Sequence, residues 1–114
     1  MSKDKRIYIS GPMSGLTRKE YLRNFREAEK ELRAKGYTSI VNPIRVWACR
    51  WPWLYRIVGY RLTLWYDLQL LKRCDAIYLL RDWEKSTGAR REYNVAWKNG
   101  LEIYKQDDEK YKLF

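Results

Sequence analysis

Short apolar runs alternate with longer amphipathic segments along this chain, and that alternation restricts the folds it can adopt. A β-branched run at residues 7–9 leads into a Gly/Pro loop, and an amphipathic stretch follows at 16–36. Residues 38–43 form a second apolar run that ends at Asn42 and Pro43. Continuous apolar strands suit a parallel sheet that is covered on both faces. The order of strand, helix and strand therefore predicts a βαβ unit, which is right-handed in nearly every known case.

The amphipathic stretch carries its own start and stop signals. Thr17 and Glu20 have capping-box spacing, and Gly36 suits the position just after a helix. One helical face carries Leu22, Phe25, Ala28 or Glu29, and Leu32. We therefore predict a helix that packs this face on the sheet.

The second half of the chain continues the same alternation. The pattern predicts a helix over about 63–74, a strand over 75–80, a helix over 86–100 and a short strand over 101–104. This alternation is typical of an α/β fold. We expect a doubly wound, Rossmann- or flavodoxin-like parallel sheet of four to five strands flanked by helices. A chain of 114 residues suits a single domain, which we expect to span residues 1–114.

The charge balance favours anionic partners. The chain has 24 Lys and Arg against 14 Asp and Glu, a formal net charge of +10. Nucleic acid, nucleotides, phosphorylated metabolites and membrane surfaces all fit such an excess. Solubility alone explains any single basic residue equally well.

The composition also argues against several kinds of site. The chain has no histidine, and Cys49 and Cys74 lack metal-binding spacing, so we expect no zinc, haem or other cofactor and no His-dependent triad. Two lone thiols fit a reducing cytoplasm. No apolar stretch is long enough to span a bilayer, and the first residues do not resemble a secretory signal.

Residues 44–62 form a Trp/Arg-rich segment that interrupts the α/β pattern. It holds three tryptophans, two tyrosines, four arginines and no acid. Interleaved arginines and aromatic rings can bind nucleic acid or anchor at a membrane surface. Packing on the sheet or on a second subunit is the favoured alternative, because aromatic stripes usually serve packing.

The loop after the first strand is one candidate binding element. Ligands of open parallel sheets bind beyond the carboxyl ends of the strands. The loop contains Ser10, Gly11, Pro12 and Met13, and glycine lets a backbone approach an anion closely. A simple Gly-Pro turn explains these residues equally well.

The start of the helix at 86–100 is a second candidate. Ser86 precedes the helix, with Gly88 and Ala89 behind it. A helix N-terminus offers free N–H groups and a positive dipole end, which suit a phosphate. Ser86 can equally act as the helix cap, and both roles are compatible.

Two acidic residues interrupt otherwise apolar helix faces. Glu92 lies three or four residues from Ala89 and Ala96, and Asp67 lies four residues from Leu71. A carboxylate at such a position loses hydration unless it is paired or used. One such acid alone favours a boundary position that reaches water or an arginine. Two acids near the same strand ends favour a functional site.

Several of these segments, in this order, resemble the nucleoside 2-deoxyribosyltransferase superfamily. They are YISGPMSG, the NF…A…L…G helix, VNP, YDLQLLKRCDAIYLL and STGARRE…A…G. The resemblance covers about residues 6–104 apart from the Trp/Arg-rich segment. The chain is most similar to a phage- and bacteria-borne family of uncharacterised deoxyribosyltransferase-like proteins, which often carries a GPMSG start and a W-E-x-S-x-G-A segment. It also resembles the 2′-deoxynucleoside 5′-monophosphate N-glycosidases.

The resemblance implies roles for four residues. Glu92 matches the nucleophile that attacks C1′ of the sugar, and Asp67 matches the acid that contacts the leaving base. Tyr8 matches a tyrosine that positions the nucleophile. Ser86 matches a serine that helps hold a 5′-phosphate in the monophosphate N-glycosidases, where the transferases use an aspartate on a 5′-hydroxyl. The implied substrate is therefore a nucleotide rather than a nucleoside.

The chemistry of these residues agrees with the resemblance. Cleavage of an N-glycosidic bond passes through an oxocarbenium-like state that one carboxylate can trap, while a second acid protonates the departing base. We therefore expect a cytoplasmic enzyme, of a bacterium or a phage-infected host, that hydrolyses or transfers at this bond without a cofactor. The resemblance further implies a homodimer or larger oligomer, since neighbouring subunits commonly complete these sites.

Two alternative functions remain open at the level of sequence. The first is a catalytically inactive protein that binds a nucleotide or a nucleotide-derived signal. The second is association with nucleic acid or a membrane surface through residues 44–62. The chain also departs from the characterised enzymes at Arg90, Arg91, Tyr93 and Asn94, where bulky side chains would narrow a pocket.

Overall fold

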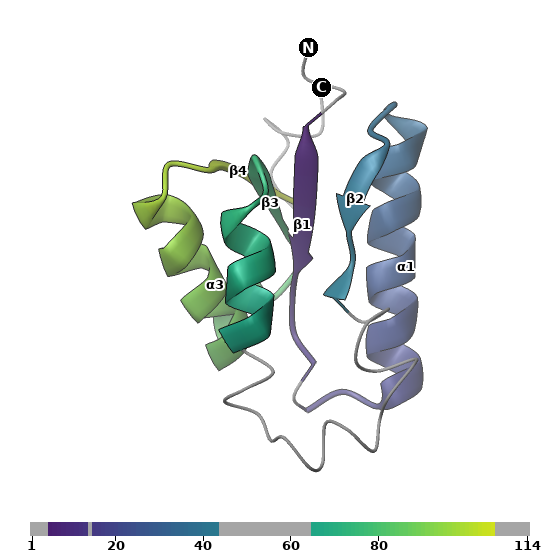
Figure 1. The fold of residues 1–114 in the computed structure, drawn as a ribbon. Helices are drawn as coiled ribbons and strands as arrows, with labels where there is room; N and C mark the ends of the chain where they lie inside the picture. Colours follow the sequence, from purple (N-terminus) through teal and green to yellow (C-terminus); the bar gives the residue numbers. More distant parts are fainter. Residues whose placement is uncertain (1–4, 14, 44–64, 107–114) are drawn as a thin grey trace.

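The protein forms an open parallel β-sheet, seen in a computed structural model that describes residues 5–13, 15–43 and 65–106 (Figure 1). The strands are β1 (Arg6–Ser10), β2 (Ser39–Val41), β3 (Ala76–Leu79) and β4 (Glu102–Lys105). Their order is β2-β1-β3-β4, and every neighbouring pair is parallel. The predicted α/β fold with a flanked parallel sheet is confirmed.

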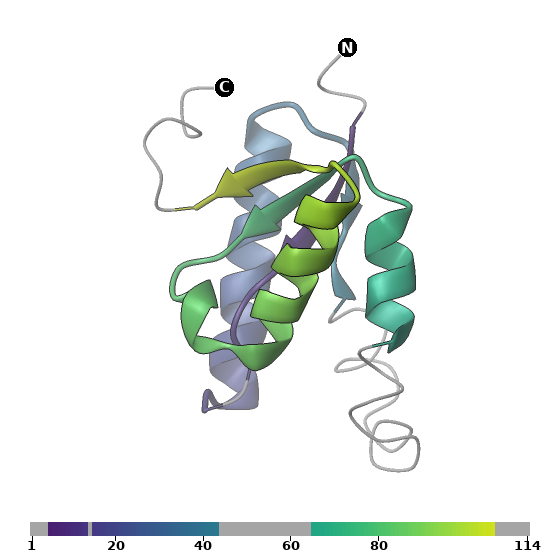
Figure 2. The same ribbon diagram turned by 90° about the vertical axis from the view of Figure 1, so that its left-hand side faces the viewer.

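Helices cover both faces of the sheet (Figures 1 and 2). Helix α1 (Arg18–Ala34) lies on one face. Helix α3 (Thr87–Lys98) and a helical segment at residues 65–72 lie on the other. A short 3₁₀ helix, η3 (Trp83–Lys85), joins β3 to α3. These elements agree with the predicted ones. The first two residues of the helix predicted over about 63–74, and the Trp/Arg-rich segment, lie outside the described residues.

The side chains of β1 alternate between the two faces of the sheet, as the two-residue period of a strand requires. Ile7 and Ile9 pack with Phe25 and Leu32 in the core under α1. Tyr8 belongs instead to a second core cluster with Leu71, Cys74, Ile77, Leu79 and Ala96. Tyr8 therefore faces α3, and so does Ser10, two residues further along the strand.

Helix α1 begins and ends as its sequence predicts. Thr17 and Glu20 form a capping box, and Gly36 follows the helix with a φ of +100°. Both residues proposed for the third position of the buried face, Ala28 and Glu29, are buried. The Glu29 carboxylate is tolerated because Arg33 Nε (3.0 Å) and Asn42 Nδ2 (3.2 Å) donate hydrogen bonds to it.

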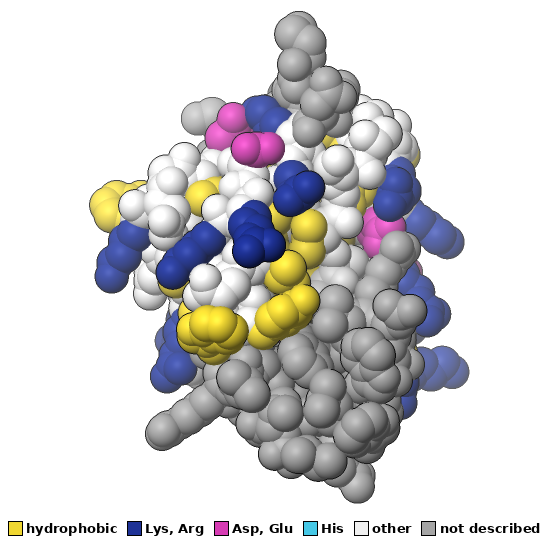
Figure 3. Space-filling model, in the orientation of Figure 1, with side chains coloured by type: hydrophobic (Ala, Val, Ile, Leu, Met, Phe, Trp, Pro, Cys, Tyr) yellow, Lys and Arg dark blue, Asp and Glu magenta, His cyan; other side chains and the backbone are white. Residues whose placement is uncertain are grey.

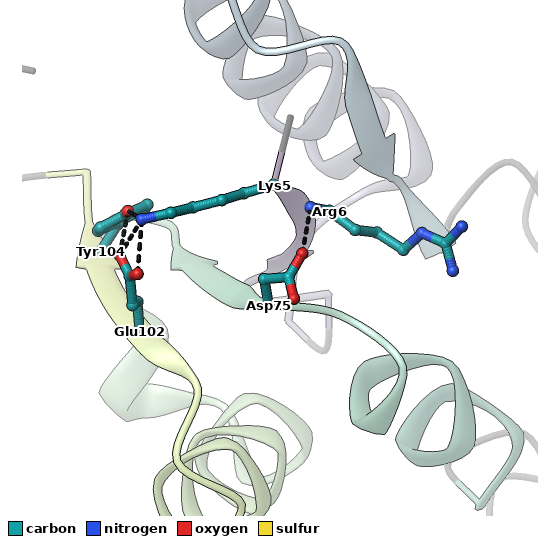
Figure 4. A network of polar contacts seen from close by, with 5 residues as sticks. All are labelled: Lys5, Arg6, Asp75, Glu102 and Tyr104. Carbon is teal, nitrogen blue, oxygen red and sulfur yellow. Dashed lines mark hydrogen bonds and ion pairs between the residues drawn. The ribbon is translucent and has the colours of Figure 1, made fainter. Parts of the chain in front are cut away.

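A polar network closes the edge of the sheet where the strands begin (Figure 4). Lys5 Nζ lies 2.5 Å from Glu102 and 3.0 Å from Tyr104 Oη, and Tyr104 also donates to Glu102. The hydrogen bond to Glu102 raises the pKa of Lys5. These contacts join Lys5, which directly precedes β1, to β4 across the intervening β3. Since the network is partly exposed, it contributes about 1 kcal/mol at most to the free energy of unfolding.

No helix within the described ranges combines the length and the apolar character that crossing a membrane requires. The sheet and its helices place only short stretches of apolar sequence in the core, and β1 and β3 supply the most deeply buried of them.

Close packing against Leu80 requires glycine at position 11. It directly follows β1, and the Leu80 N–H donates to the Ser10 carbonyl at 2.8 Å. A Cβ on Gly11 would lie 2.7 Å from Leu80 Cβ, closer than non-bonded carbons approach. The chain therefore crosses over Leu80 at a point where no side chain fits.

Gly11→Ala should lower the free energy of unfolding by about 1–3 kcal/mol, because the new methyl overpacks against Leu80. Gly15→Ala is the comparison: Gly15 has a φ of +85° and no atom within 4 Å of its added Cβ. That variant should lose only about 1 kcal/mol, from backbone strain alone. Urea denaturation measures both values, and equal losses would contradict the close contact.

Candidate active site

Helix α3 carries Glu92 toward the sheet. Ser86 is the N-cap of this helix, and its Oγ accepts a hydrogen bond from the Ala89 N–H at 3.2 Å. From that start, the helical period turns Ala89, Glu92 and Ala96 to the buried side. The cap role predicted for Ser86 is therefore confirmed, and the anomalous acid of the sequence is a buried residue.

Two hydroxyl groups of β1 hold the Glu92 carboxyl. Tyr8 Oη donates to Oε2 at 2.5 Å, and Ser10 Oγ donates to Oε1 at 2.6 Å. The exposed fractions of Tyr8, Ser10 and Glu92 are only 0%, 1% and 7%. Each carboxyl oxygen thus has its own buried donor, at the carboxyl end of a central strand.

The described salt bridges do not include the carboxyl of Glu92. By contrast, the other buried glutamate, Glu29, is paired with Arg33. Among the described residues, Glu92 is therefore held by neutral donors alone.

Burial strongly changes the pKa values of Glu92 and Tyr8. Loss of hydration raises the pKa of Glu92 to about 7, against the lowering effect of the hydrogen bonds from Ser10 and Tyr8. Burial, followed by the charges of Glu92 and Asp67, raises the pKa of Tyr8 well above its ordinary value. Tyr8 therefore stays protonated and remains a hydrogen-bond donor, while Glu92 titrates near neutral pH.

Asp67 lies on the same face of the sheet as Glu92. It belongs to the helical segment at residues 65–72, whose Leu71 packs in the core cluster that contains Tyr8. Its charge contributes to the raised pKa of Tyr8, so it lies within electrostatic range of the tyrosine. The two acids singled out in the sequence thus lie on different helices of the same face, and the charges of both raise the pKa of Tyr8.

The last residue of β1 and the loop after it divide between the two faces of the sheet. Ser10 points to Glu92, whereas Met13 packs against the core cluster under α1. The Met13 carbonyl also accepts from the Leu16 N–H at 3.2 Å and closes a turn. Gly11 and Pro12 between them are partly buried. Of the loop residues chosen from the sequence, Ser10 is the one that contacts the acid.

The bulky residues next to Glu92 in the sequence make none of the hydrogen bonds to its carboxyl group that Tyr8 and Ser10 make. Arg90, Arg91 and Asn94 are exposed. Tyr93 is partly buried and stacks on Trp83, with ring centroids 4.8 Å apart. The departures from the characterised enzymes therefore lie beside the carboxyl and make no hydrogen bond to it.

Basic side chains gather on the face formed by α3 and residues 65–73 (Figure 3). The exposed charged residues of these two segments are Lys72, Arg73, Arg90, Arg91 and Lys98. The acids of the same segments, Asp67 and Glu92, are both at least partly buried. The exposed charges of these two segments are therefore all positive, which favours anions.

The described residues offer no obvious metal site. No group of three or more His, Cys, Asp or Glu side chains gathers among them. Cys74 is buried, its Sγ donates to the Leu70 carbonyl, and burial raises the pKa of its thiol to about 11. The thiol is therefore protonated and poorly reactive at neutral pH.

The role of Ser10 toward Glu92 was missed by the sequence analysis, which grouped this serine with phosphate-binding loop residues. One signal was available, because strand alternation places residues 8 and 10 on one face. Their common partner, however, lies 82 residues from Ser10. No local pattern reports a contact at that separation.

A family model for a domain of unknown function (DUF4406) matches residues 5–105. The chain belongs to the DUF4406 family. No curated protein matches it. Tyr8, Ser10, Asp67 and Glu92 all lie inside the matched range, so the buried carboxyl and its partners are part of the DUF4406 domain itself.

Glu92→Gln should change the pH dependence of stability of this DUF4406 domain. A folded-state pKa of about 7, above the ordinary 4.5, means that the folded protein holds a proton that the unfolded chain releases. The contribution of Glu92 to stability is therefore greatest below pH 4.5 and is lost as pH rises through 7. Relative to wild type, the variant should gain up to about 3 kcal/mol between pH 4.5 and 8.

Denaturation of both proteins across this pH range measures the difference. Glu27→Gln, at an exposed position of α1, is the matched control and should show no such gain. A wild-type minus Glu92→Gln difference that does not change with pH would contradict the raised pKa.

Proposed function

We propose that this DUF4406 domain cleaves or transfers at the N-glycosidic bond of a (deoxy)nucleotide, with Glu92 as the nucleophile. The observation that carries the proposal is the buried Glu92 carboxyl, which two hydroxyls hold and no described cation neutralises. A carboxyl kept only for structure is better stabilised by a cation, as Glu29 is by Arg33. An unneutralised carboxylate instead suits a developing positive charge on the substrate.

The first chemical step uses Glu92 as a carboxylate. One of its oxygens attacks C1′, the bond between C1′ and the base nitrogen breaks, and the base takes the bonding electron pair. The product on the protein is an ester between Glu92 and the sugar. Each carboxyl oxygen retains a lone pair beyond the one that its hydroxyl donor occupies, so attack does not require loss of either hydrogen bond.

The second step releases the sugar. Water attacks C1′, its proton passes to the Asp67 carboxylate, and the bond between C1′ and the Glu92 oxygen breaks to regenerate the Glu92 carboxylate. If a second nucleobase attacks instead of water, the outcome is transfer. We assign proton exchange to the Asp67 carboxyl, on the other helix of the same face: in its protonated form it gives a proton to the departing nucleobase in the first step, and it takes a proton from the attacking water or nucleobase in the second.

Substrate charge is the basis for choosing a nucleotide. The exposed charges on α3 and residues 65–73 are all positive, which favours a phosphate-bearing substrate. Ser86 and the first turn of α3 with Gly88 and Ala89 are the proposed 5′-phosphate site, together with the backbone at Gly11 and Pro12. Ser86 and Glu92 are six residues apart on one helix, about 9 Å along its axis.

Wild-type protein should release free base from at least one 5′-monophosphate in a panel of (deoxy)nucleosides, their 5′-monophosphates and NAD. Chromatography of the products measures it. Glu92→Gln should lower the rate at least about 10³-fold, because the nucleophile is gone. Asp67→Asn should lower it by about 10²–10⁴-fold, because proton delivery to the base is lost.

Glu27→Gln is again the control and should keep the wild-type rate. Release of no base from any compound by the wild-type protein would overturn the proposed enzyme. Nucleotide binding without base release would instead identify a binding protein.

The pH profile of the reaction should report the ionisation of Glu92. Because attack requires the carboxylate and the pKa of Glu92 is about 7, kcat/KM should rise with pH up to about 7 and then level off on this limb. Initial rates of base release at low substrate concentration measure this profile. A rate that is already maximal at pH 5 would contradict the assignment of Glu92.

A further inference from the structure

We propose that Ser10 is a positioning residue that orients the Glu92 carboxylate and maintains its ionised form. This inference rests on the proposed function of Glu92 and deepens it. Neither the resemblance to deoxyribosyltransferases nor the family assigns this role to Ser10. Its basis is the contact of Ser10 Oγ with Glu92 Oε1 at 2.6 Å, in a nearly inaccessible place.

Two donors on two different oxygens constrain the carboxyl more than one donor does. Tyr8 alone would hold Oε2 and leave the group free to rotate about its last side-chain bond. The hydrogen bond from Ser10 to Oε1 defines the plane of the carboxylate as well. The direction of the free lone pairs is thereby set, and a nucleophile needs that alignment toward C1′.

The position of Ser10 is itself rigid. Its residue pairs with Leu79 in the register of β1 and β3, and its carbonyl accepts from the Leu80 N–H at 2.8 Å. Gly11 then packs against Leu80 with no room for a side chain. The hydroxyl is therefore delivered to Glu92 by a backbone that is fixed on both sides of it.

Ser10 and Tyr8 are the groups whose hydrogen bonds favour the ionised form of Glu92. Burial raises the pKa of Glu92, and the hydrogen bonds from Ser10 and Tyr8 lower it. Asp67 and Cys74 act on Tyr8. The charged groups on η3 and β4, which pack near α3, are Glu84, Lys85, Glu102 and Lys105, and none is a cause of the Glu92 shift.

The direct test is the titration of Glu92 by NMR of protein labelled with ¹³C at the glutamate side-chain carboxyl. The Glu92 signal is assigned by its loss in Glu92→Gln. Its midpoint in wild type should lie at about 7. In Ser10→Ala the midpoint should rise by about one pH unit, because a hydrogen bond to the charged form is lost.

Three variants complete the design. Ser10→Cys keeps the site filled, with a slightly larger group that is a weak donor, so it should also raise the midpoint if donation, and not packing, is responsible. Tyr8→Phe should raise it through the other oxygen. Ser39→Ala, at an exposed serine of β2, is the matched control and should leave the midpoint unchanged.

The results that would overturn the role of Ser10 differ from those that would overturn the proposed function. Wild-type midpoints in both Ser10→Ala and Ser10→Cys would overturn the role of Ser10, whether or not the protein is an enzyme. If Ser10→Ala does not fold, Ser10→Cys decides. The absence of base release would overturn the proposed function and leave the titration result in place.

Base release adds a readout that a purely structural defect would not produce. At pH 7, Ser10→Ala should reduce kcat/KM by about fivefold, because a rise of one unit from a pKa of about 7 lowers the ionised fraction of Glu92 from about one half to about one tenth. That loss should shrink as pH rises to about 9, where Glu92 is ionised in both proteins. A loss of the same size at every pH would contradict an effect through ionisation.

Discussion

The hydrogen bonds from Tyr8 and Ser10 to the Glu92 carboxyl are the interaction on which the candidate site depends. A buried carboxylate without a cation is costly, and neutral donors reduce that cost only in part. Strand alternation in β1 and the helical period of α3 bring the three groups together. The close crossing of Gly11 over Leu80 holds the end of β1 in place. The fold thus supports an ionisable group where stability alone would favour an apolar one.

Much of this architecture follows from local sequence patterns. The strands and helices agree with the predicted ones because periods of 2 and 3.6 residues and the capping box at Thr17 are local signals. The burial of Glu92 also followed from spacing, since Ala89 and Ala96 lie on the same helical face. The carboxyl ends of parallel strands then directed attention to one edge of the sheet.

The contacts that define the chemistry of the site could not be predicted from local sequence patterns. The partner of Ser10 lies 82 residues away, and Gly11 is required by Leu80 from a different strand end. A glycine in a loop has many possible reasons, and only the assembled sheet shows which applies. The assembled fold is likewise needed to place Met13, which packs against the core under α1. It is also needed to explain the burial of Glu29, which accepts a hydrogen bond from Asn42.

The most direct measurement of the central claim is mass spectrometry of the intact protein after rapid acid quench during turnover of a 5′-monophosphate. If Glu92 is the nucleophile, the protein should gain the mass of one sugar phosphate, and peptide mapping should locate it on Glu92. Base release without any such adduct on Glu92, or with the adduct on another residue, would contradict the account.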